Sequence, residues 1–61
     1  MSIQSDTMKQ IRQWVQVRKA KKITQAEISK MSGVSRSHIA NFENLRVNNM
    51  YLYDFYRHMF D

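Results

Sequence analysis

Apolar residues recur at spacings of three and four along most of the chain, which is the pattern of helices that bury one face. In the first third, this pattern follows Ser5 and Asp6, whose side chains can accept hydrogen bonds from the free N–H groups of a first helical turn. The sequence therefore predicts a helix from Ser5 or Asp6 to near Ala20. Its inward stripe is expected to consist of Met8, Ile11, Trp14, Val15 and Val17.

Two shorter helices are predicted next, on either side of the single glycine of the chain. Thr24 and Glu27 have the spacing of a capping box, in which each side chain binds a free backbone N–H at a helix start. Gly33 is expected to end that helix with a positive φ, and Ser35 is expected to cap the helix that follows. The inward residues are expected to be Ile28 and Met31 before the turn and Ile39 and Phe42 after it.

A fourth helix is predicted near the end of the sequence. Asn48 or Asn49 can cap it, and it runs almost to Asp61. Its apolar side chains are more numerous than one helix face can bury, so some are candidates for a protein interface, where Tyr and Phe are enriched. The alternative is that all of them wrap a small core. The predicted inward stripe is Leu52, Phe55 and Met59, and the interface candidates are Tyr51, Tyr53, Tyr56 and Phe60.

Composition agrees with an all-α fold. The chain has no Pro and one Gly, so it lacks the residues that short strands and hairpins need at their turns. Its 61 residues suffice for one domain, which we expect to be a compact four-helix unit spanning residues 1–61. No stretch approaches the roughly 20 apolar residues that are needed to cross a bilayer.

Charge and residue chemistry narrow the function. The 10 Lys and Arg residues against 5 Asp and Glu give a formal net charge of +5, which favours binding to nucleic-acid phosphates whatever the base sequence. The chain has no Cys, and His38 and His58 fall on different predicted helices, so no metal, cofactor or catalytic centre is expected. The four-residue spacing of Asp54 and His58 indicates a local surface interaction rather than catalysis.

The segment from Ile23 to Asn44 combines a Thr-Gln opening at 24 and 25, the turn glycine, a Val-Ser-Arg-Ser run at 34–37 and a Glu-Asn close. In this combination it resembles the helix-turn-helix of the phage Cro and CI repressor (XRE) family. The resemblance covers roughly residues 8–60. It implies a lambda-repressor-like domain that places its third helix in the major groove of DNA, although many relatives continue into a fifth helix.

The resemblance also implies individual roles. Arg18 and Glu43 match a structural ion pair that braces the first helix against the third. Arg36 could donate two parallel hydrogen bonds to guanine, and Asn41 could pair with adenine. The implied base-reading set is Ser35, Arg36, Ser37 and Asn41. The phosphate contacts expected are Thr24, Gln25, His38, Asn44, Arg46, Lys19 and Lys22.

Some of these assignments have simpler alternatives. His38 lies at the edge of the recognition face, where a solvated or packing role is the competing interpretation. Lys19, Lys21 and Lys22 could equally form a solvated face.

Three positions depart from the family pattern. Lys22 and Leu45 stand where the family often has Gly, so both turns must be built differently or with strain. Ser29 replaces a small apolar Ala in the second helix.

The function expected is that of a sequence-specific regulator of transcription, a phage or prophage repressor that binds double-stranded DNA in the cytoplasm of a bacterial or infected host cell. A homodimer on a palindromic operator would place two recognition helices about 34 Å apart. The alternative is a modulator or antirepressor that pairs with a repressor protein. No small-molecule partner is expected. A membrane partner is not expected either, because a capped turn at Gly33 is incompatible with one continuous amphipathic helix.

Overall fold

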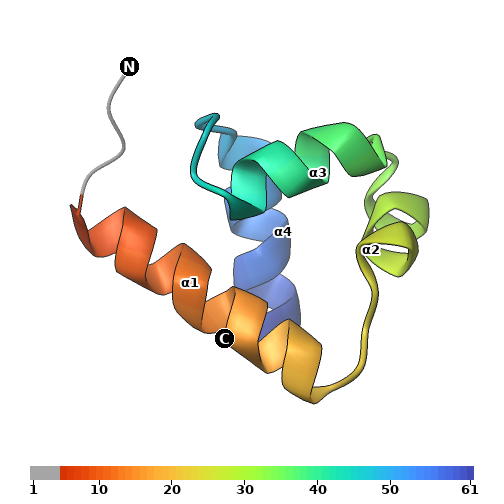
Figure 1. Ribbon diagram of the computed structural model, residues 1–61, viewed down its shortest axis with the longest axis horizontal. Coiled ribbons are helices and arrows are strands. Elements are labelled where there is room, and N and C mark those ends of the chain that lie inside the picture. The colour runs from red at the N-terminus through yellow and green to blue at the C-terminus, as the bar shows by residue number, and fades with distance from the viewer. Residues whose placement is uncertain (1–4) are drawn as a thin grey trace.

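A computed structural model describes residues 5–61 of the chain, so the first four residues of the expected domain lie outside the description. It contains four helices in the order α1 Ser5–Ala20, α2 Gln25–Ser32, α3 Arg36–Glu43 and α4 Met50–Phe60 (Figure 1). Residues 5–61 contain no strand, so the all-α prediction is confirmed.

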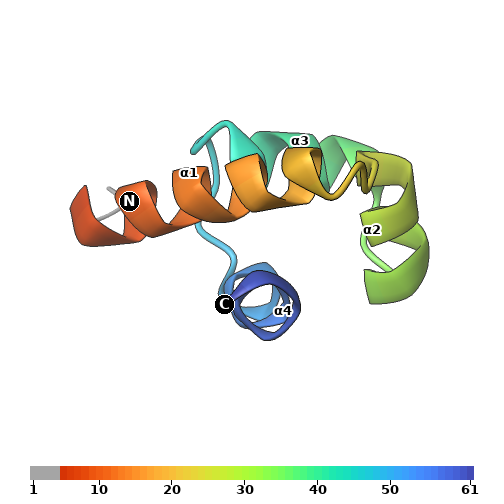
Figure 2. The same cartoon turned by 90° about the horizontal axis from the view of Figure 1, so that it is seen from below.

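The helices lie in two layers. In Figure 1, α1 and α3 lie toward the viewer with α2 at one side, and α4 passes behind them. Figure 2 shows α4 end-on beneath the layer of α1 and α3. The main packing partner of α2 is α3, and that of α4 is α1. One outer side of α4 is therefore left uncovered by the other helices.

The predicted helix ends are present. The Thr24 hydroxyl accepts a hydrogen bond from the backbone N of Glu27 at 3.1 Å, and the Glu27 carboxylate accepts one from the backbone N of Thr24 at 3.0 Å. Gly33 ends α2 with φ 76, and its N–H donates to the carbonyl of Ser29. Ser35 caps α3. These ends depend on neighbours within five residues, which is why the sequence alone was sufficient to predict them.

The core forms from one stripe of each helix. Its fully buried members are Ile11, Trp14, Ile28, Ile39, Phe42, Leu52 and Tyr56. The prediction that Met31 faces inward is wrong, because its side chain is 52% exposed. Ser32, one turn after Ile28, takes the buried position on α2 instead. In a helix of only two turns, the apolar spacing alone does not fix which side faces the core.

The inward face of α4 also differs from the prediction. Leu52 and Tyr56 are the buried residues of this helix, whereas Phe55 and Met59 are half-buried at its edge. Tyr56, expected at an interface, is fully buried, because its hydroxyl finds a polar partner inside the domain.

Two more interface candidates are half-buried and pack within the domain. The ring of Tyr53 contacts Trp14 edge-on, with centroids 4.8 Å apart. The ring of Phe60 contacts Tyr56, with centroids 5.5 Å apart. Of the four candidates, only Tyr51 is exposed, at 56%. The alternative interpretation, in which the aromatic residues wrap a small core, therefore describes most of this tail.

The two turns that lack glycine adopt a conformation that favours it. Lys22 has φ 60 and Leu45 has φ 63, both in the left-handed region. After α1, Ile23 N donates to Arg18 O at 3.1 Å and Lys22 N to Lys19 O at 3.0 Å, which is a Schellman motif. After α3, Leu45 N donates to Phe42 O and Arg46 N donates to Asn41 O, which is the same pair of hydrogen bonds. Both turns are thus built as in glycine-containing chains, and the side chains impose strain there.

Candidate nucleic-acid interface

The expected ion pair between α1 and α3 is present and buried. Arg18 Nε lies 2.8 Å from Glu43 Oε2, and its Nη2 lies 2.9 Å from Oε1, so the contact is bidentate. The third nitrogen of the guanidinium, Nη1, donates to the carbonyl of Ile23 at 2.7 Å. Arg18 therefore fixes the turn between α1 and α2 as well as the end of α3.

The Glu43 carboxylate also receives hydrogen bonds from the other two helices. Gln25 Nε2 at the start of α2 donates to Oε1 at 2.9 Å, and the Tyr56 hydroxyl on α4 donates to Oε2. One carboxylate thus joins all four helices. Burial opposes its charge, but the hydrogen bonds from Arg18, Tyr56 and Gln25 outweigh burial and lower the pKa of Glu43. Burial and the adjacent carboxylate raise the pKa of Tyr56.

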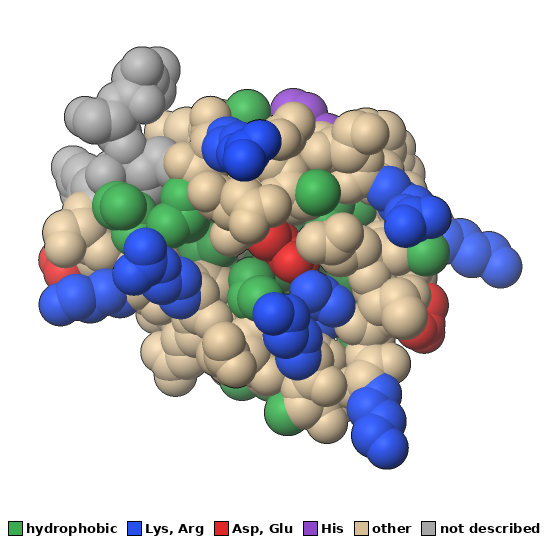
Figure 3. All heavy atoms as spheres, in the orientation of Figure 1, with side chains coloured by type: hydrophobic (Ala, Val, Ile, Leu, Met, Phe, Trp, Pro, Cys, Tyr) green, Lys and Arg blue, Asp and Glu red, His purple; other side chains and the backbone are tan. Residues whose placement is uncertain are grey.

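A shallow groove with basic residues lies where the end of α1, the start of α2 and the start of α3 meet. It is lined by Lys19, Lys22, Thr24, Gln25 and Arg36 together with the buried Arg18. Figure 3 shows Lys and Arg side chains spread over the face formed by α1, α2 and α3, some at its edge and some beside an acidic side chain in its middle. The structure therefore brings four expected phosphate contacts into one groove and places Arg36 beside them.

The front of α3 presents the expected base-reading residues unevenly. Ser35, Arg36 and Ser37 are exposed, and Asn41 is half-buried. Arg36 and Ser37 line a second hollow together with Gln25, which adjoins the basic groove. The Ser35 hydroxyl accepts the hydrogen bond of the His38 N–H, so part of its capacity is used as a helix cap.

Several of the expected DNA contacts already have partners within the chain. Gln25 donates to Glu43, and the Asn44 amide turns back to donate to Ala40 O at 2.9 Å. The half-buried His38 lies with Nε2 2.8 Å from Asn49 Nδ2. Arg46, by contrast, is exposed. Gln25, His38 and Asn44 are thus held by contacts within the chain, whereas Arg46 is exposed to solvent.

Two residues of this arrangement had no predicted role in it. Tyr56 was assigned to the outside of α4, although its four-residue spacing from Leu52 could have indicated a shared inward stripe. Asn49 was one of two residues, with Asn48, predicted to cap the fourth helix, and it is the cap in the structure. Its contact with His38 joins residues eleven positions apart. No local pattern in the sequence reveals that contact.

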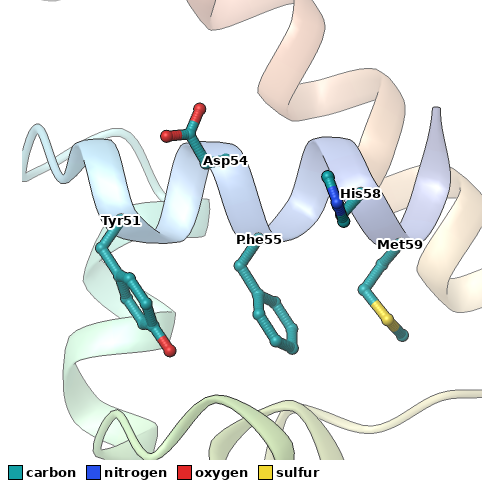
Figure 4. A pocket seen from close by; sticks show the side chains of 5 residues that line it. All are labelled: Tyr51, Asp54, Phe55, His58 and Met59. Carbon is teal, nitrogen blue, oxygen red and sulfur yellow. The ribbon is translucent and has the colours of Figure 1, made fainter.

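A separate apolar hollow lies on the exposed side of α4. It is lined by Tyr51, Asp54, Phe55, His58 and Met59. Figure 4 shows Tyr51, Phe55 and Met59 extending from α4 in one direction, away from the Asp54 carboxylate. The Tyr51 hydroxyl reaches the end of α2 and donates to Ser32 O at 2.8 Å.

The described part of the chain contains no group of three His, Cys, Asp or Glu side chains that could hold a metal ion. Within residues 5–61, no helix has the length and apolar character needed to cross a membrane.

Comparison with known proteins agrees with this geometry. The sequence model of the helix-turn-helix family matches residues 16–48, which is more than half of the chain and runs from the last turn of α1 to just before α4. No curated protein and no solved structure matches the chain. The match, the capped turn at Gly33 and the exposed front of α3 lead to one conclusion: this chain belongs to the Cro/CI-like (XRE) helix-turn-helix family of DNA-binding regulators.

Proposed function

We propose that the chain binds specific sequences of double-stranded DNA and acts as a transcriptional repressor encoded by a phage or prophage. The observation that carries the proposal is the exposed front of α3, with Arg36 and Ser37 directly beside a groove that holds Lys19 and Lys22. Side chains that can donate to bases lie there next to cations that can bind phosphate. An interface that reads a DNA sequence needs both. A repressor of this kind would act by occupying DNA in the bacterial or infected host cell.

In this proposal the front of α3 enters the major groove. Arg36 pairs with guanine O6 and N7, and Ser37 with a neighbouring base. Asn41, one turn further on, reaches adenine from a half-buried position. The groove residues hold the adjacent DNA strand, with Lys19 and Lys22 supplying charge. Gln25 keeps one amide hydrogen on Glu43 and offers the other to phosphate.

Duplex selection followed by salt titration tests this function. The chain selects duplexes from a random pool, and affinity for a selected duplex and a random duplex is measured from low to high salt. Specific binding should exceed random binding by at least roughly 1,000-fold at physiological salt. Equal affinity for both duplexes at every salt concentration would leave only electrostatic attraction and contradict sequence-specific regulation.

We further propose that the α4 hollow binds a second copy of the chain. Two polar residues one turn apart, Asp54 and His58, also line the hollow, and the Asp54 carboxylate is directed away from the apolar row. Two such helices packed antiparallel about a two-fold axis would set Asp54 of each copy opposite His58 of the other. This surface is thus self-complementary, because apolar side chains would meet apolar side chains and the Asp54 carboxylate would accept a hydrogen bond from the His58 ring of the other copy.

A charge swap tests the dimer. In sedimentation equilibrium, His58→Asp should shift the chain toward monomer, because it places like charges opposite each other. Adding Asp54→Lys to His58→Asp should restore association. Met50→Lys is the matched control, because Met50 is 66% exposed on the same helix outside the hollow. If the unaltered chain is a monomer, the proposed dimer is contradicted. If it is a monomer and also binds no duplex, the results would favour a modulator that binds a repressor protein.

A further inference from the structure

A hydrogen bond between α3 and the start of α4 favours one position for the proton of the His38 ring. His38 is the third residue of α3, and Asn49 is the residue before α4. Asn49 Nδ2 lies 2.8 Å from His38 Nε2, and Asn49 Oδ1 accepts a hydrogen bond from Leu52 N at 3.0 Å. Both ends of one amide group are therefore engaged.

The helix cap fixes the orientation of this amide. If oxygen and nitrogen of Asn49 were exchanged, the NH₂ group would face the Leu52 N–H, two donors would meet, and α4 would lose its cap. Asn49 Nδ2 must therefore donate to His38 Nε2. A ring nitrogen that accepts a hydrogen bond carries no proton, so this contact favours the ring form that carries its proton on Nδ1. An imidazolium would place two donors 2.8 Å apart.

We infer that Asn49 is a positioning residue that holds neutral His38 with its Nδ1–H as a hydrogen-bond donor to a DNA phosphate. The inference rests on the proposed DNA-binding function. Its spatial support is that Asn49 ends the segment after α3, which also carries the two expected phosphate contacts Asn44 and Arg46. The hydrogen bond thus ties His38 to the last residue of that segment.

A neutral donor leaves a signature that distinguishes it from a cation. Each cationic contact to duplex DNA releases counterions and adds about 0.9 to the slope of log affinity against log salt. A neutral N–H contributes to affinity without this release. His38→Ala should therefore weaken binding to every duplex by about tenfold, with the salt slope unchanged. Lys19→Ala should lower the slope.

The experiment combines two measurements on the full chain. Nitrogen-15 NMR of the unbound protein at neutral pH reports the tautomer of His38, and we expect the proton on Nδ1. Asn49→Ser keeps a capping hydroxyl but removes the donor to the ring. It should abolish the preference for Nδ1–H and reduce duplex affinity about as much as His38→Ala. Selected and random duplexes of equal length serve as probes.

The outcomes separate the inference from the proposed function. A ring protonated on Nε2 or on both nitrogens in the free protein would overturn the positioning role, whether or not any variant folds. A salt slope that falls by about 0.9 in His38→Ala would identify an imidazolium contact and overturn the neutral donor. Unchanged affinity in His38→Ala would overturn the phosphate contact. Failure of the unaltered chain to prefer its selected duplex would refute the proposed function but leave the tautomer result intact.

Discussion

At the scale of single residues, Arg36 and Lys19 line the same groove but have different expected effects. Arg36→Ala should cost about 1 to 3 kcal/mol of binding free energy, concentrated at one base position, because a bidentate contact to guanine is lost. Lys19→Ala should weaken all sequences evenly and lower the salt slope by about 1. Affinities for single-base variants of a selected duplex distinguish the two. Equal losses for Arg36→Ala on specific and random DNA would refute base reading.

The left-handed backbone at Lys22 gives a second prediction at this scale. A side chain at φ 60 costs about 1 to 2 kcal/mol of folding free energy. Glycine avoids this cost, but it makes the unfolded chain more flexible, which offsets part of the gain. Lys22→Gly should therefore raise the free energy of unfolding by up to about 1 kcal/mol. Thermal denaturation measures it, with Lys21→Gly as a control that removes the same charge in the same turn without left-handed backbone. A gain of equal size in the control would contradict the strain.

At the scale of elements, Gly33 sets the angle between α2 and α3. A Cβ at this position would meet no atom within 4 Å, so only the φ of +76 opposes a larger residue. Gly33→Ala should lower the free energy of unfolding by about 1 kcal/mol, and Gly33→Asn by less, because Asn tolerates this conformation better. Urea denaturation of both variants measures the difference. Equal stability of all three proteins would show that the turn exerts no strain on a side chain.

A hydroxyl supports the same turn. Ser29 Oγ donates to Val34 O at 2.6 Å, so the serine that replaces the family's usual alanine bridges the last turn of α2 and the start of the connection to α3. Ser29, which departs from the family pattern, thus makes a hydrogen bond that an alanine could not make.

Prediction from the sequence succeeded for the helix ends and for the buried faces of α1 and α3, and it was wrong for parts of the faces of α2 and α4. The caps at Thr24, Ser35 and Asn49 follow from short-range donor and acceptor chemistry, which the residue order displays directly. The side of α4 that is buried depends on Tyr56 meeting Glu43, thirteen residues away. Similarly, the hydrogen bond from Gln25 to Glu43 spans eighteen residues. Spacing along one helix carries no information about a polar partner on another.

At the scale of the whole molecule, Glu43 makes stability depend on pH. Its pKa is lower in the folded protein than the ordinary value of 4.5, so its stabilising effect is complete above pH 4.5 and is lost as pH falls through the folded pKa. Unfolding free energy should therefore decrease below about pH 4.5. In Glu43→Gln the protein should be less stable at neutral pH and show a weaker acid dependence. Denaturation at a series of pH values checks this, and an identical acid slope in the variant would contradict it.

The meeting of four helices on one carboxylate also bears on how the molecule opens. No helix can detach without depriving a buried charge of a donor, and the chain is too small to keep a second core when that happens. Amide protons in the middle of all four helices should therefore exchange with heavy water at one common, slowest rate. The recognition helix would then keep its shape for as long as the protein remains folded, and search DNA as a rigid reader rather than a segment that orders on arrival.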